Sequence, residues 1–173
     1  MWQHPFSKKT ITSKFGARQN RKSPHRGLDY APKANEIIPA VTAGEVRLIQ
    51  WSNILGWVVV QNAKDLKTNK TVFIGYSHLS CASHGVNCKG PKVHGKHSPL
   101  KSTVVGSKKE LAEPIGRVGN TGSASTGPHL HLTISPTLKG VFYGTVYDPE
   151  KFIDEQIVEA NKPKLCKCCQ RPL

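Results

Sequence analysis

Glycine and proline occur so often in this chain that a long helical bundle or a coiled coil is excluded. The 173 residues include 15 glycines and 12 prolines, so one of them falls about every six residues. Both residues are disfavoured inside helices, and both mark turns between short extended segments. A chain of this length is expected to form one domain with its own core. The pattern therefore predicts a mainly β fold.

Extended segments in the middle of the chain predict a small antiparallel β-sheet. Residues 41–49 are expected to form a strand, a turn and a second strand, and residues 56–62 and 71–78 are rich in β-branched and aromatic residues. Residues 115–118 are expected to resume the same sheet. Leucine and isoleucine alternate with histidine and threonine over residues 129–134, which predicts a strand with two different faces.

One short helix is predicted near the C-terminal end of the chain. Asp148 can cap its first turn, and Pro149 is suited to the first helical position. Phe152, Ile153 and Ile157 then give the helix an apolar side.

Two segments are expected to lie outside the core. Residues 80–110 are rich in Lys, His, Ser and Gly, which indicates a long loop insertion in a domain that spans residues 1–160. Residues 161–173 are predicted to form a flexible tail. All the cysteines lie in these two segments: Cys81, Cys88, Cys166, Cys168 and Cys169. Their odd number leaves the redox compartment open. For the insertion, a plain His-rich loop with a Cys81–Cys88 disulfide is favoured over a second, structural zinc site.

The chain is strongly basic, with 25 Lys and Arg against 11 Asp and Glu and a net charge of +14. Such a surface attracts polyanions, either nucleic acid or anionic wall polymers, although a solvated basic surface is the plainer interpretation. No nucleic-acid-binding motif is present, so no nucleic-acid partner is expected. No apolar run is long enough to span a membrane, and the first ten residues lack the apolar core of a signal peptide.

Histidine is the residue type in this sequence that is best suited to metal binding and catalysis. His129 and His131 are two residues apart on a predicted strand, so their side chains point to the same face. His25 and Asp29 add an imidazole and a carboxylate from a segment expected to be loop or edge strand. Two histidines and an aspartate suit a catalytic zinc ion, because three protein ligands leave the fourth position for water. Taken singly, each motif is common, and His78 at a strand end is typical of a structural histidine.

The ordered set of motifs resembles the lysostaphin/LytM-like zinc metalloendopeptidases, which cleave the peptides of bacterial peptidoglycan. The resemblance covers about residues 12–153 and is weakest over 80–110. The motifs in order are H-x-x-x-D at 25–29, P-A-V at 39–41, A-G-E-V at 43–46, Y-S-H-L at 76–79, G-N-T-G at 119–122 and S-T-G-P-H-L-H at 125–131.

The resemblance implies a role for each of five residues and a groove across the sheet. His25, Asp29 and His131 match the ligands of one catalytic Zn²⁺, and His78 and His129 match the catalytic histidines. The implied activity is hydrolysis of cross-links or stem peptides of peptidoglycan. An inactive wall-binding or regulatory module of the same fold is the alternative, but all five positions are filled. Gly-Gly bridges and D-Ala cross-links to a diamino acid are both cleaved in this family, so the bond is left open.

Two departures from the family pattern bear on the site. The insertion is longer than usual, and residues 18–23 lack the tyrosine with which some members steady the oxyanion, so no oxyanion stabiliser is carried over. A lone catalytic domain without a leader is typical of a phage lysin or a virion-associated hydrolase, with a fragment of a larger secreted enzyme as the alternative. We expect a monomer that acts at the bacterial cell wall.

Overall fold

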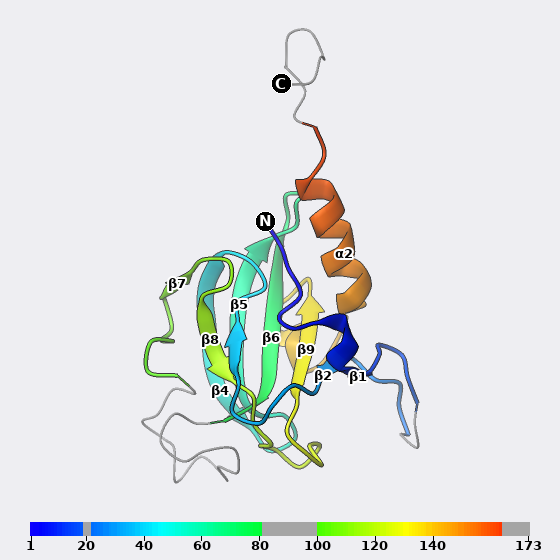
Figure 1. Ribbon diagram of the computed structural model, residues 1–173, viewed down its shortest axis with the longest axis vertical. Helices are drawn as coiled ribbons and strands as arrows, with labels where there is room; N and C mark the ends of the chain where they lie inside the picture. The colour runs from blue at the N-terminus through cyan, green and yellow to red at the C-terminus, as the bar shows by residue number, and fades with distance from the viewer. Residues whose placement is uncertain (19–21, 81–99, 164–173) are drawn as a thin grey trace, which may run out of the picture.

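The computed structural model describes residues 1–18, 22–80 and 100–163, and its main feature is an open seven-stranded sheet (Figure 1). Every pair of neighbouring strands is antiparallel. In order across the sheet, the strands are β1 (Ile11–Ser13), β2 (Leu28–Tyr30), β9 (Leu130–Ser135), β6 (Thr71–Leu79), β5 (Gly56–Lys64), β4 (Gly44–Ser52) and β7 (Lys108–Lys109). The predicted mainly β, antiparallel fold is confirmed.

A second, two-stranded sheet lies apart from the first. It pairs β3 (Ile37–Pro39) with β8 (Pro114–Arg117). The prediction that residues 115–118 resume the main sheet is therefore wrong. Strand β6 already has β5 and β9 as its neighbours, and β8 instead buries Ile115 in the core beside Ile38 of β3.

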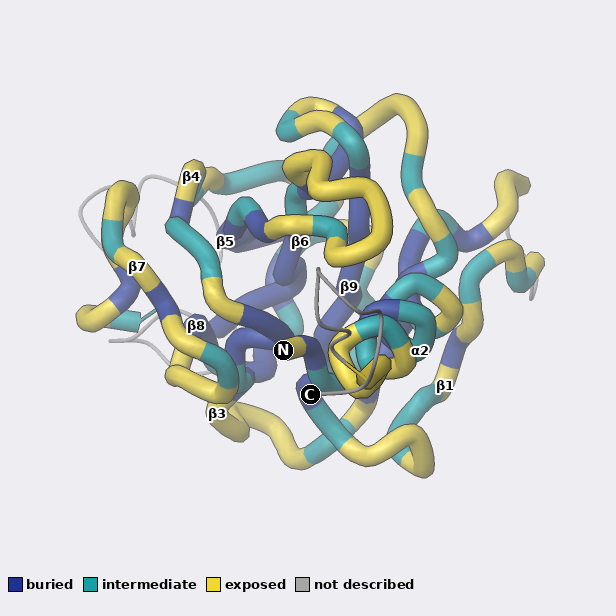
Figure 2. Tube along the Cα trace, turned by 90° about the horizontal axis from the view of Figure 1, so that it is seen from above, coloured by how far each residue is buried: buried dark blue, intermediate teal, exposed yellow. Residues whose placement is uncertain are grey.

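Buried side chains cover both faces of the central strands. Val59 belongs to a large cluster that includes Trp2 from the N-terminal segment. Val58 and Val60 point to the opposite face, where they pack with Val141 of the short helix η2 (Lys139–Val141). Figure 2 shows the resulting buried middle of the molecule along β5, β6 and β9. Because these strands are fixed from both sides, their ends are rigid supports for side chains.

The predicted C-terminal helix is present as α2 (Pro149–Ala160), which lies beside β9 (Figure 1). Asp148 caps it by accepting hydrogen bonds from two backbone N–H groups of the first turn, and Pro149 occupies that turn. Ile153 is fully buried, and Phe152 packs edge-on against Trp2 with ring centroids 5.5 Å apart. At 12 residues, α2 is too short and too polar to cross a bilayer, and so is each other helix of the described segments.

Several sequence predictions concern residues outside the described part of the chain. They include all five cysteines, the histidines of the insertion and most of the tail after residue 161. Among the described residues, the N-terminal segment also forms a short 3-10 helix, η1 (Lys8–Thr10). The proposed division into residues 1–160 and 161–173 stays a prediction.

Candidate metal and catalytic site

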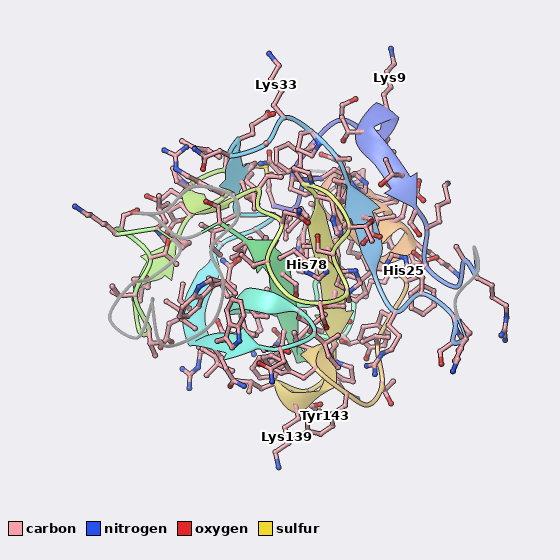
Figure 3. The ribbon with its side chains drawn as sticks, turned by 90° about the horizontal axis from the view of Figure 1, so that it is seen from below. Lys9, His25, Lys33, His78, Lys139 and Tyr143 are labelled. Carbon is pink, nitrogen blue, oxygen red and sulfur yellow. The ribbon has the colours of Figure 1, made fainter. Side chains whose placement is uncertain are left out.

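The five histidine and aspartate side chains singled out from the sequence come together where β6 ends and β9 begins. Asp29 lies on β2 and His131 on β9, and the two are direct partners across these strands. His25 precedes β2, His78 is next to last in β6, and His129 precedes β9. Figure 3 shows His78 near the middle of this end of the molecule and His25 toward β2.

The side chains of His25, Asp29 and His131 are buried and aim one atom each at a common point. Asp29 Oδ1 lies 2.8 Å from His131 Nδ1 and 3.1 Å from His25 Nε2. The two ring nitrogens are 3.0 Å apart. Zinc–nitrogen and zinc–oxygen bonds of about 2.0–2.1 Å in a tetrahedron place ligand atoms about 3.4 Å from one another. The three distances are about 0.3–0.6 Å shorter than that spacing, a small adjustment for side chains, so the three residues fit a zinc ion.

The hydrogen bonds of His25 show which of its nitrogens can serve as a ligand. Its Nδ1 lies 3.0 Å from the carbonyl oxygen of Lys14 and 3.1 Å from the Ser13 hydroxyl. A carbonyl oxygen can only accept, so Nδ1 carries the proton. In the uncharged ring, Nε2 then presents its lone pair to the other two ligand atoms, as a cation site requires.

Burial and mutual contact shift the pKa values of the other two candidate ligands. Burial lowers the pKa of His131, although Asp29 acts in the opposite direction. Burial alone would raise the pKa of Asp29, but hydrogen bonds and positive charge from His131 and His25 hold it well below its usual range. A carboxylate beside an uncharged imidazole is the state in which both can bind a metal ion.

His78 reaches the site because the backbone of β6 is irregular there. The register with β5 shifts between the pairs Trp57–Leu79 and Val59–Tyr76, which marks a β-bulge, and His78 has a left-handed backbone with φ of 61°. In a regular strand His78 would share the face of Tyr76, in the large core cluster. Instead its ring lies beside His129, with centroids 4.6 Å apart.

Both of these histidines are held through Nδ1 by carbonyl groups of one loop, residues 119–129. His78 Nδ1 donates to the Thr121 carbonyl over 2.7 Å, and His129 Nδ1 donates to the Gly127 carbonyl over 2.8 Å. The Ser125 hydroxyl lies 3.2 Å from the same His129 nitrogen. The Nε2 atoms are therefore the proton-accepting atoms of both uncharged rings, and that of His129 is 3.9 Å from Asp29 Oδ1. Burial, reinforced by His129 and His131, lowers the pKa of His78 to about 3.

The five residues lie in a trough built from two adjoining hollows. Asp29, Ala124 and His129 line both, so the two hollows meet at these residues. One hollow extends past Arg26, Ile54 and Leu55, the other past Thr12, Thr126 and Pro128. A peptide chain could thus lie across the site, as the groove expected from the sequence requires.

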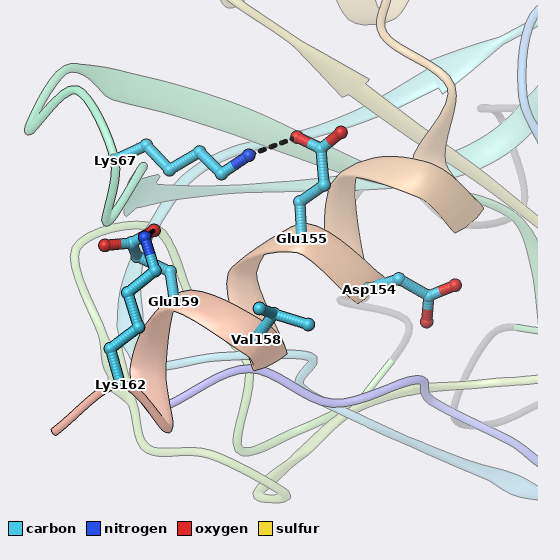
Figure 4. Close-up of a pocket in the computed structure, with 6 residues that line it drawn as sticks. All are labelled: Lys67, Asp154, Glu155, Val158, Glu159 and Lys162. Carbon is cyan, nitrogen blue, oxygen red and sulfur yellow. Dashed lines mark hydrogen bonds and ion pairs between the residues drawn. The ribbon is translucent and has the colours of Figure 1, made fainter.

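A separate hollow lies along the exposed side of α2 (Figure 4). Its walls carry surface ion pairs, between Lys67 and Glu155 at 2.8 Å and between Lys162 and Glu159 at 2.7 Å. None of the five site residues lines it. This hollow therefore has no part in the site.

Two supporting residues were not singled out by sequence reasoning. A Cβ atom on Gly27 would lie 2.6 Å from a ring carbon of His131 and 2.5 Å from the Leu132 carbonyl oxygen, so only glycine fits at position 27. Thr121 holds the ring of His78. Gly27 stands at an unspecified position of the H-x-x-x-D motif, and Thr121 is the third residue of G-N-T-G. Their places in these motifs are the signal by which the sequence could have indicated them.

No protein-family model matches the sequence, but solved structures do. LytU is 27% identical, with a TM-score of 0.61, over 90% of this chain and 91% of LytU. The catalytic domain of the antimicrobial peptidase lysostaphin from Staphylococcus simulans is 22% identical, with a TM-score of 0.58, over 83% of this chain and 91% of that domain. A zinc containing peptidase from Vibrio cholerae is 23% identical, with a TM-score of 0.56, over 76% of this chain and 35% of its own.

These matches define the class of the fold. The chain has the lysostaphin/LytM-like fold of the M23 peptidases. The resemblance that the ordered motifs predicted is confirmed at this level. The present chain spans about a third of the length of the Vibrio cholerae peptidase but nearly all of LytU.

Proposed function

We propose that this protein is a zinc-dependent endopeptidase that hydrolyses peptide cross-links or stem peptides of bacterial peptidoglycan. The observation that carries the proposal is the convergence of His25, Asp29 and His131 on one point, beside His78 and His129. The fold supports it, since it is shared with lysostaphin, an antimicrobial peptidase, and with the zinc containing peptidase from Vibrio cholerae.

The ligand residues would hold one Zn²⁺ through His25 Nε2, His131 Nδ1 and a carboxylate oxygen of Asp29. When bound, zinc supplies Lewis acidity that polarises a peptide carbonyl and makes water more acidic. Asp29 keeps its negative charge because its pKa lies well below the usual range. Gly27 leaves room for the His131 ring beside the common point of the ligand atoms.

His78 and His129 would move the protons of the reaction. Each ring has its Nδ1 proton engaged by a backbone carbonyl, so Nε2 is free to accept a proton from the attacking water. Hydrolysis also requires a proton on the departing amine, and the same Nε2 can return it. The centroid distance of 4.6 Å between the rings lets both act on one bond in the trough.

The substrate and the place of action follow from the same proposal. The trough accepts an extended peptide, and the net charge of +14 favours anionic wall polymers as a secondary binding partner. We propose a monomer that acts at the bacterial cell wall, as a phage lysin or virion-associated hydrolase. A fragment of a secreted enzyme would use the same site.

The decisive experiment is digestion of purified sacculi of two types, one with glycine cross-bridges and one with direct D-Ala cross-links. Mass spectrometry of the new amino termini identifies the cleaved bond. Cleavage should stop with a zinc chelator and return with added zinc. The matched control is His4→Gln, because His4 binds Tyr30 and Asp154 away from the trough. Wall binding without new termini in either type would favour the inactive binding module instead.

A further inference from the structure

The Thr121 hydroxyl links β5 and β6 beside the bulge that contains His78. It accepts a hydrogen bond from the Trp57 backbone N–H over 3.1 Å and donates one to the Leu79 carbonyl over 2.8 Å. Trp57 and Leu79 are partners in the strand register, and the shift in that register begins at this pair. A side chain from a distant loop thus completes the strand pairing at its irregular point.

The same residue also holds the ring of His78. The Thr121 carbonyl accepts the Nδ1–H of His78 over 2.7 Å, while the hydroxyl binds the carbonyl of Leu79, the next residue along the chain. His78 needs such support because its φ of 61° is a conformation that residues other than glycine rarely adopt. Thr121 is 2% exposed, so water cannot replace these bonds.

Two glycines let Thr121 approach this closely. A Cβ atom on Gly56 would lie 2.1 Å from the Thr121 hydroxyl oxygen, and one on Gly122 would lie 2.2 Å from the Gly56 nitrogen. Both glycines have positive φ, of 66° and 85°. The start of β5 and the 119–129 loop are therefore in backbone contact, and the position of the Thr121 side chain is constrained by this contact.

We propose that Thr121 is the positioning residue of His78: its hydroxyl fixes the bulge and its carbonyl fixes the ring. The inference rests on the proposed function, in which His78 Nε2 exchanges protons with the substrate. Thr121 touches neither the trough nor the ligand atoms, so it acts through His78 alone.

The test compares Thr121→Val with Thr121→Ser. Valine keeps the shape and the backbone carbonyl but removes the hydroxyl, so the bulge loses its link to Trp57 and Leu79. The carbonyl that holds the His78 ring is then no longer fixed in place, and the ring shifts with it. We expect kcat on a cross-link peptide to fall about 10- to 100-fold, because small misplacements of catalytic groups cost that much. KM should change less than about threefold, since the trough is intact, and zinc content should stay the same. Serine keeps the hydroxyl and should restore most of kcat.

The matched control is Thr42→Val. Thr42 is also buried, and its hydroxyl donates to the Met1 carbonyl over 2.7 Å beside the N-terminus, which lies near the opposite end of the sheet (Figure 1). The melting temperature of this variant should fall as that of Thr121→Val does, but its kcat should stay at the wild-type value. Nitrogen NMR of the histidine rings gives a readout that does not need turnover: the Nδ1 signal of His78 should move in Thr121→Val and stay in Thr42→Val.

Wild-type kcat in Thr121→Val, or a loss that Thr121→Ser does not reverse, would overturn the proposal. An unmoved His78 signal would overturn it as well. Absence of cleavage by the unaltered protein would instead refute the proposed function, and the NMR comparison would still decide whether Thr121 holds His78.

Discussion

Asp29 and His131 face each other as direct partners across β2 and β9, with Asp29 Oδ1 2.8 Å from His131 Nδ1. Their separation is thus set by the spacing of two hydrogen-bonded strands. His25 completes the group from a loop that the Lys14 carbonyl holds in place. The strand register and the Lys14 contact therefore set the positions of the three proposed ligand atoms.

Loss of one ligand should remove the metal. In His25→Ala, Asp29→Ala and His131→Ala, zinc affinity should fall by more than about 100-fold, since loss even of a residue that only orients a ligand costs about 10- to 100-fold. Metal analysis of dialysed protein measures this, with His4→Ala as the control. Zinc close to one per chain in all three variants would refute the ligand assignment.

His78 and His129 should be dispensable for zinc but not for hydrolysis. His78→Gln and His129→Gln remove the proton-accepting Nε2 and leave the three ligands in place. Turnover of sacculi should fall about 10²- to 10⁴-fold, the usual contribution of general acid–base catalysis, with unchanged zinc content. If one variant turns over like the wild type, the role assigned to that histidine is wrong.

Gly27→Ala should weaken zinc binding without touching a ligand. The new methyl group would meet the His131 ring at 2.6 Å and must displace it. Gly127→Ala is the matched control for metal content, because a Cβ atom at Gly127 has no neighbour within 4 Å. Titration with a competing chelator should show weaker binding in Gly27→Ala only. Equal affinities would mean that the ring can move aside at no cost.

The metal-free protein should lose stability as pH falls below about 6.5. Burial lowers the pKa of His78 to about 3, whereas an exposed histidine has a pKa near 6.5, so between these values the unfolded chain binds more protons. Above pH 6.5 His78 causes no loss of stability. By pH 5 its preferential protonation in the unfolded chain lowers the free energy of unfolding by about 2 kcal/mol. Urea denaturation at both pH values measures it. His78→Gln should show a shallower dependence, and an identical one would contradict the assignment to His78.

The net charge of +14 should govern wall binding and not the chemistry. Screening shortens electrostatic reach to about 8 Å at physiological ionic strength and about 3 Å at 1 M. Binding to intact walls should therefore weaken steeply with salt, while cleavage of a neutral cross-link peptide should barely change. The comparison should be run above about pH 7, because histidine must be uncharged to bind zinc. Equal salt sensitivity of both would show that salt acts on the site or the fold.

Most strands, and the residues that come together at the candidate site, could be predicted from the sequence. The pairing of the strands and the direction of each side chain could be predicted less well. Alternation over residues 129–134 was enough to place His129 and His131 on one face, because that face depends only on the period of a strand. The same rule puts His78 on the face of Tyr76, and the bulge reverses it. Thr121, which contacts the bulge, is 43 residues away from His78 in sequence, so the strand pattern alone cannot predict it. For the same reason, the pairing of β8 with β3 and the need for glycine at Gly27 are visible only in the folded chain.

The closed loop from Gly119 to His129 has a consequence for how such a protein is assayed. Its ends are joined by the His129 N–H, which donates to the Gly119 carbonyl over 3.0 Å, and its carbonyls hold His78 and His129, the two histidines proposed to transfer protons. The proposed metal ligands are held elsewhere, by β2, β9 and the segment before β2. Under the proposed function, local damage to the loop that displaces these histidines would leave a protein that still binds the metal but no longer cleaves. Bound metal is thus no measure of the active fraction in a preparation, which only titration of turnover can supply.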